Sequence, residues 1–140
     1  MDESFQKKCE EVKNIFEPLT TEQRYQTLIE MGRKLPAFPA EHKTPDRIVP
    51  GCQSTLYLST SYLNNKLFFQ CSTDALISAG LAALLMNVYS GESPETILKC
   101  PPTFLSELGI AATLSPSRSN GLAHIHLRMK QEALRFLMKS

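Results

Sequence analysis

The segment Thr55–Cys71 reads TLYLSTSYLNNKLFFQC, and the fold of the rest of the chain is predicted around it. Apolar and polar residues alternate in both of its halves, which is typical of strands with one buried face. The central Asn64-Asn65 pair tolerates positive φ angles, so the segment predicts a β-hairpin with a two-residue turn. Pairing of Leu63 with Lys66 then puts seven residues on the face that should pack on helices: Leu56, Leu58, Thr60, Tyr62, Leu67, Phe69 and Cys71.

Two helices are predicted on the N-terminal side of the hairpin. Residues Asp2–Phe16 place apolar side chains at helical spacing, and Pro18 ends the pattern. A second helix is expected to begin after an N-cap at Thr20 or Thr21. The proline-containing stretch 36–47 is interpreted as a loop that leads to the hairpin.

The segment that follows the hairpin predicts the core helix of the fold. Residues Asp74–Tyr89 are apolar nearly all round, and Ser72 or Thr73 is the expected N-cap. Gly80 inside this helix costs about 1 kcal/mol relative to alanine, so another element is expected to pack closely against it.

Shorter helices are predicted near residues 94–99 and 103–108, followed by a last helix over about Ser119–Lys139. The order of helices, a hairpin and more helices predicts an α+β fold, in which a small antiparallel sheet packs against several helices. We expect a single domain over residues 1–140.

Composition excludes several classes of function. The chain has 140 residues, of which 42% are hydrophobic and 21% charged, and its formal net charge of +1 offers no basic surplus for nucleic acid. The longest apolar run, Ala75–Val88, is too short to span a bilayer, and the charged stretch Met1–Glu10 does not resemble a secretory signal. We therefore expect a cytoplasmic protein with reduced cysteines and no membrane partner.

A cysteine stands immediately before the hairpin, in the stretch GCQS at residues 51–54. Gly51 permits backbone angles that other residues avoid, which favours a shaped loop around Cys52. Arg47 and the backbone N–H groups of Gln53 and Ser54 are candidates for stabilising a Cys52 thiolate. A catalytic or carrier thiol and a structural loop cysteine both fit these residues.

Two other uses of Cys52 stay open at this point. A cysteine hydrolase would need His42, His124 or His126 beside the thiol, and a zinc site would have to combine Cys52 and Cys71 with the last two histidines. A Cys52–Cys71 disulfide is not expected, because Cys52 precedes Leu58, the partner of Cys71, by a span of roughly 20 Å of extended chain. Cys71 is instead interpreted as a strand residue that faces the core.

Two segments farther along the chain connect with the GCQS stretch. STDALISAGL occupies residues 72–81, and LSPSRSNGL occupies residues 114–122. Together with IEMGRKLP at residues 29–36, these motifs and their order resemble the SufE family of sulfur acceptors for cysteine desulfurases. The likeness extends over most of the chain and implies a fold of the SufE and IscU type.

The resemblance implies a mechanism and a set of partners. Cys52 would accept persulfide sulfur from a SufS-like desulfurase, stimulate that enzyme and pass the sulfur to a SufBCD-like scaffold that builds iron–sulfur clusters. The residues implied to support Cys52 are Gly51, Gln53, Ser54, Asp74 and Arg118. Pyridoxal phosphate would belong to the desulfurase, and this chain would need no metal or cofactor and would not turn over alone. A homodimer is compatible with the resemblance.

The sequence departs from the family pattern in two places. Leu56-Tyr57 stands where members often carry tryptophan, and Cys71-Ser72-Thr73-Asp74 stands where they often have G-D-S-D. The second change adds a thiol at a motif position and leaves a redox role for Cys71 open. Neither change alters the loop that carries Cys52.

Overall fold

Residues 2–139 are described by the computed structural model of this chain. The end residues of the predicted domain, Met1 and Ser140, lie outside the described residues. Helix α1 spans Glu3–Phe16 and helix α2 spans Thr21–Arg33. Thr20 and Gln23 form a capping box at the start of α2, which confirms the predicted N-cap.

The hairpin has the predicted register. Strand β1 (Leu56–Leu63) pairs antiparallel with β2 (Lys66–Thr73), and Leu58 lies opposite Cys71. Asn64 and Asn65 have φ angles of 52° and 62°, as the two-residue turn requires. These strands form a two-stranded sheet, so the α+β prediction is confirmed.

One face of the hairpin is buried as expected, except near its turn. Five of the predicted core residues are buried: Leu56, Leu58, Leu67, Phe69 and Cys71. Tyr62 keeps 37% of its surface exposed because it lies near the turn, where the hairpin extends beyond the core. Its ring stacks on Phe136 with centroids 5.2 Å apart.

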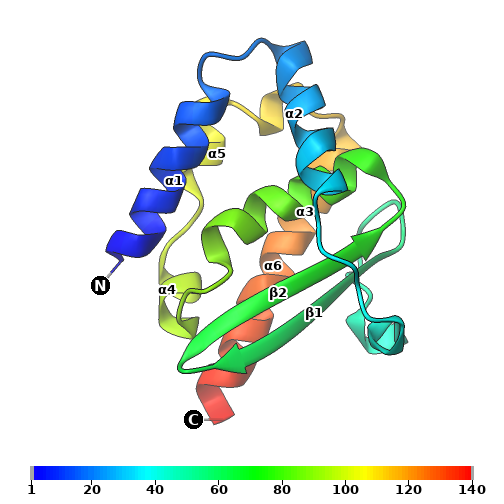
Figure 1. The fold of residues 1–140 in the computed structure, drawn as a ribbon, viewed down its shortest axis with the longest axis vertical. Coiled ribbons are helices and arrows are strands. Elements are labelled where there is room, and N and C mark those ends of the chain that lie inside the picture. Colours follow the sequence, from blue (N-terminus) through cyan, green and yellow to red (C-terminus); the bar gives the residue numbers. More distant parts are fainter. Residues whose placement is uncertain (1, 140) are drawn as a thin grey trace.

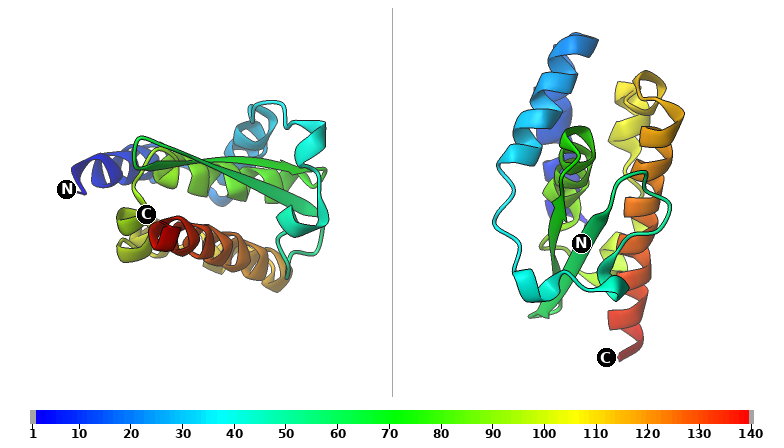
Figure 2. Two further views of the ribbon diagram at one scale, coloured as in Figure 1. Left: turned by 90° about the horizontal axis from the view of Figure 1, so that it is seen from below. Right: turned by 90° about the vertical axis from the view of Figure 1, so that its right-hand side faces the viewer.

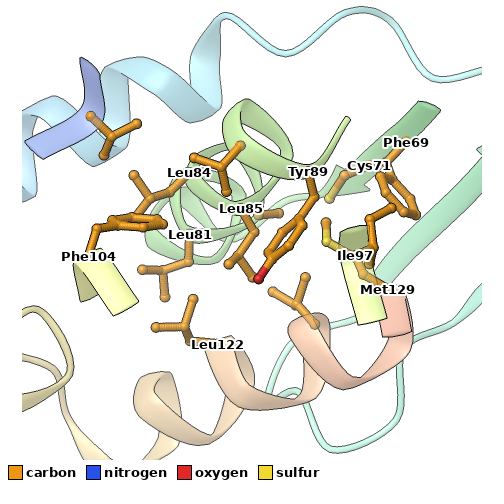
Figure 3. Packing of buried hydrophobic residues seen from close by; sticks show 14 of the residues in the cluster. Phe69, Cys71, Leu81, Leu84, Leu85, Tyr89, Ile97, Phe104, Leu122 and Met129 are labelled. Carbon is orange, nitrogen blue, oxygen red and sulfur yellow. The ribbon is translucent and has the colours of Figure 1, made fainter. Parts of the chain in front are cut away.

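Helix α3 (Leu76–Tyr89) is the central helix of the molecule. Figure 3 shows its residues Leu81, Leu84, Leu85 and Tyr89 packed among side chains of the neighbouring elements. It begins two residues later than predicted, and neither Ser72 nor Thr73 is its N-cap. Both residues instead continue β2, where they pair with Tyr57 and Leu56. Strand pairing therefore overrides the capping preference of these residues.

The prediction of a close neighbour at Gly80 is confirmed. A Cβ atom at this position would lie 2.6 Å from the carbonyl carbon of Leu28 and 2.9 Å from its Cβ atom. Gly32 makes the reciprocal approach, since a Cβ atom there would lie 2.8 Å from that of Ala79. Helices α2 and α3 therefore touch backbone to backbone at two glycines.

The C-terminal part adds α4 (Pro94–Lys99), α5 (Thr103–Leu108) and the long α6 (Pro116–Lys139). Short 3₁₀ turns lie at Ala40–His42, Pro45–Arg47 and Ala111–Thr113. Helix α6 starts three residues earlier than predicted, because Ser115 accepts hydrogen bonds from the first turn through its side chain and its carbonyl group.

The elements are arranged around α3, which contacts α1, α2, α6 and β2 (Figure 1). Figure 2 shows α6 along one side of α3 and α2 on the opposite side, with the segment before β1 running beside α6. In the described part of the chain, no helix combines the length and the apolar character needed to cross a membrane.

Candidate functional site

The segment 46–55, here called the Cys52 loop, folds back on the first strand. Ile48 forms an isolated antiparallel bridge with Tyr57, and the N–H of Val49 donates to the carbonyl oxygen of Leu56 over 2.9 Å. The chain therefore makes a tight reversal that has Cys52 near its turn, as Pro50 and Gly51 favour.

This reversal corrects the separation expected between Cys52 and Cys71. The distance of roughly 20 Å assumed an extended chain, and the loop is not extended. Burial raises the pKa of Cys71 to about 12, and Cys52 adds to this rise, so Cys52 lies nearer to Cys71 than an extended chain would place it. Both cysteines are free thiols, and Cys71 faces the core as predicted.

Gly51 is needed for two reasons. Its φ angle is +87°, which side-chain-bearing residues rarely adopt. A Cβ atom at this position would also overlap the imidazole ring of His124 on α6. The conformational role predicted for Gly51 is confirmed, but the space beside it is filled by a histidine that sequence reasoning had not placed there.

Cys52 lies at a cavity of about 540 Å³ between the Cys52 loop and three helices. The loop contributes Cys52, Gln53 and Ser54, so the structure brings these predicted residues together. Arg118, from the first turns of α6, lines the same cavity although it is far away in sequence. The GCQS and PSRS motifs therefore form one site.

Asp74 does not line this cavity. It lies between β2 and α3 in a neighbouring depression, together with Gly32 and Arg33 of α2. Ala75 and Leu76 border both hollows, which places Asp74 beside the site rather than in it.

The Cys52 thiol is sheltered but not activated. Its hydrogen bond is a weak one to the carbonyl oxygen of Gly121, with a sulfur–oxygen distance of 3.9 Å, and the described residues supply no other. Burial raises the pKa of Cys52, and none of the cations in residues 2–139 opposes this rise. The expected contribution of Arg47 is wrong, because its guanidinium group donates to Thr44 instead. Among the described residues, no backbone N–H group donates to the Cys52 sulfur, so the predicted contribution of Gln53 and Ser54 is not seen.

The histidines have other partners. His42 is hydrogen-bonded to Ser59 over 3.0 Å, and His126 stacks on Tyr89 with ring centroids 5.4 Å apart. Burial, followed by the charge of Lys130, lowers the pKa of His126 to about 4. None of the three forms a hydrogen bond with the Cys52 thiol, which a cysteine hydrolase would need in order to generate a nucleophile.

The zinc alternative also finds no support. Across residues 2–139, histidine, cysteine, aspartate and glutamate side chains do not gather in any group of three that could hold a metal ion.

Several residues of the site were missed by sequence reasoning. Tyr25 and Ile29 of α2 line the cavity, as do Leu81 of α3 and Gly121 and Ile125 of α6. Tyr25 and Ile29 are four positions apart, so one face of α2 could have been inferred to point at a common neighbour. The sequence pattern did not indicate whether this neighbour was the core or a cavity.

Comparisons with known proteins identify the family of this chain. Residues 10–133 match the family model SufE, described as an Fe-S metabolism associated domain. The sulfur acceptor protein CsdE of Escherichia coli is 37% identical over 117 residues, covering 81% of this chain and 80% of that protein. The cysteine desulfuration protein SufE of Wigglesworthia glossinidia brevipalpis is 30% identical over 137 residues, and the match covers 96% of this chain and 95% of that protein.

A solved structure has the same fold. The solution structure of a hypothetical protein from Thermus thermophilus aligns with a TM-score of 0.78 and 27% sequence identity, covering 94% of this chain and 96% of that one. The family model matches residues 10–133, and the relatives are 30–37% identical over most of their length. This chain therefore belongs to the SufE family.

Proposed function

We propose that this chain accepts sulfur from a cysteine desulfurase on Cys52. Family membership supports this proposal, as do the relatives named sulfur acceptor protein and cysteine desulfuration protein. The observation that carries it is the environment of Cys52, a half-buried thiol at the edge of a cavity that lacks a catalytic base. Such a thiol is suited to transfer with a partner and poorly suited to independent hydrolysis.

The chemistry is a thiol exchange. The Cys52 thiolate attacks the outer sulfur of a persulfide on the desulfurase, and the bond between the two sulfurs of that persulfide breaks. The cysteine of the desulfurase leaves as a thiolate, which takes up the proton that Cys52 gave up. Cys52 becomes a persulfide, and no oxidant or reductant is consumed.

Partner dependence follows from the resting state of the thiol. Burial raises the pKa of Cys52, so the protonated form dominates near neutral pH until a partner changes its surroundings. Leu76 presents an apolar side chain at the cavity, since 51% of it is exposed. We assign supporting roles to Gly51, Gln53, Ser54 and Arg118 inside the site, and to Asp74 beside it.

The finer steps belong to the same proposal. Stimulation of the desulfurase and delivery of the sulfur to a SufBCD-like scaffold follow from the family resemblance, as does the placement of pyridoxal phosphate on the desulfurase alone. A cytoplasmic location stays a prediction, because the relatives include a chloroplastic and mitochondrial SufE-like protein.

Mass measurement of the intact chain tests the proposal. After incubation with a desulfurase and cysteine, wild type should gain about 32 Da, the mass of one sulfur atom. Cys52→Ser should gain nothing while keeping its helical circular dichroism. Cys71→Ala, which removes the neighbouring buried thiol, should gain the same mass as wild type. A wild-type chain without the adduct, or an adduct that survives in Cys52→Ser, would refute the assignment.

A further inference from the structure

One face of α6 holds the Cys52 loop along much of its length. Gly121, His124 and Arg128 are three and four positions apart, so they lie on the same side of the helix. The Gly121 carbonyl oxygen accepts from the Cys52 thiol, the His124 ring packs against Gly51, and Arg128 reaches the start of the loop. Figure 2 shows the loop beside this part of α6.

Arg128 makes the strongest of these contacts. Its Nη1 donates to the carbonyl oxygen of Ile48 over 3.0 Å, and its Nη2 donates to that of Asp46. Both hydrogen bonds come from a charged donor, and such bonds are about twice as strong as neutral ones. Gly121 and His124, by comparison, hold the tip of the loop through one weak sulfur contact and van der Waals packing.

We propose that Arg128 is a positioning residue, which keeps the Cys52 loop on α6 at rest and sets how readily Cys52 is presented to a partner. The proposal rests on the assigned sulfur-acceptor function, because presentation matters only if a partner must reach this thiol. Arg128 does not line the cavity that contains Cys52, so it acts through the loop backbone and not on the reacting sulfur.

Besides Arg128, the loop is held at Val49, whose side chain is buried in the core, so the opening proposed here concerns the rest of the loop. One backbone hydrogen bond, from Val49 to Leu56, connects it to the sheet, and the Ile48–Tyr57 bridge lies beside that bond. Without Arg128, movement of the loop away from α6 no longer requires two charge-assisted bonds to break. We expect the open fraction to rise roughly tenfold, which corresponds to about 1.4 kcal/mol.

Native-state alkylation of Cys52 measures this opening without any partner. The other three cysteines are buried, with exposed fractions of 8%, 4% and 8% for Cys9, Cys71 and Cys100, so iodoacetamide should label Cys52 first. Labelling of Arg128→Ala should be roughly tenfold faster than that of wild type. Arg135→Ala is the matched control, because Arg135 is on the same helix but bonds Glu132 within it, and its rate should stay within about twofold of wild type.

A second variant distinguishes opening of the loop from a general loss of stability. Arg128→Lys keeps the charge and the aliphatic stem but donates from a single nitrogen, so its labelling rate should fall between those of wild type and Arg128→Ala. In urea, Arg128→Lys should unfold in one cooperative transition and lose no more unfolding free energy than the change in its labelling rate accounts for. Wild-type labelling rates in both Arg128 variants, or an equal increase in Arg135→Ala, would overturn the proposal.

Sulfur transfer separates this proposal from the function on which it rests. With a desulfurase present, Arg128→Ala should lower the KM for this chain by up to roughly tenfold, because less of the binding energy is needed to open the loop, and kcat should change little. An unchanged KM would contradict a role in presentation. If wild type accepts no sulfur but Arg128→Ala still labels faster, the control of the loop stands and the proposed function fails.

Discussion

The contact between α2 and α3 makes a sharp prediction for Gly80→Ala. In an open helix this substitution should stabilise the protein by about 0.5–1 kcal/mol, because alanine has the higher helix propensity. At position 80, however, the new methyl group would lie 2.6 Å from the carbonyl carbon of Leu28, and Cβ atoms essentially never approach other atoms within 3.0 Å. Helix α2 must then move away from α3.

The size of the effect follows from these two opposing contributions. Overpacking of a core costs about 1–3 kcal/mol, and the upper half of that range applies because the obstacle is backbone and not a flexible side chain. After the gain in helix propensity is subtracted, Gly80→Ala should lose about 1–2.5 kcal/mol of unfolding free energy. Since Tyr25 and Ile29 reach the cavity from α2, the shift should also change the surroundings of Cys52.

Urea unfolding monitored by circular dichroism measures the predicted loss. Gly121→Ala is the matched control, because a Cβ atom there would lie 4.0 Å from the Cys52 sulfur, an ordinary contact distance. This control should unfold at the same urea concentration as wild type or at a higher one. If Gly80→Ala is as stable as Gly121→Ala, then α2 and α3 do not meet at their backbones and the reasoning fails.

Two further predictions concern stability. The lowered pKa of His126, about 4 against an ordinary 6.5, means that the unfolded chain binds a proton that the folded chain resists. The stabilising contribution of neutral His126 is therefore present above pH 6.5 and lost as the pH falls toward 4. Between these pH values the urea midpoint should drop more in wild type than in His126→Phe. Equal drops in the two proteins would contradict the assignment. Asn65 has a φ of 62°, which glycine adopts more readily, so Asn65→Gly should raise the melting temperature. Asn65→Val should lose about 1–2 kcal/mol of unfolding free energy. A valine variant as stable as wild type would argue against this turn.

The hairpin could be predicted from sequence because two independent constraints agree. The alternation of side chains fixes which face is buried, and a two-residue turn at Asn64-Asn65 leaves a single register. The close neighbour of Gly80 was predictable for a similar reason, since a glycine in an otherwise strong helix is unfavourable unless another element needs the space.

The Cys52 loop could not be predicted in the same way. Its reversal depends on hydrogen bonds between Val49 and Leu56 and on contacts with α6, which lies about seventy positions farther along the chain. No periodic pattern encodes such contacts, so the position of Arg47 in sequence gave a wrong neighbour for the thiol. The motifs that contain Cys52 and Arg118 indicated a shared site through family resemblance, and packing explains how they meet.

The unactivated state of Cys52 also affects how long an idle copy of this protein stays intact. A thiol with a pKa of 9.0 is about 1% ionised at pH 7, and burial raises the pKa of Cys52 above that value. Peroxides and soft electrophiles react with the ionised form, so they should consume resting copies slowly. Selectivity for sulfur then depends on when the thiol is uncovered, and not on a strong intrinsic nucleophile that every oxidant in the cell could exhaust.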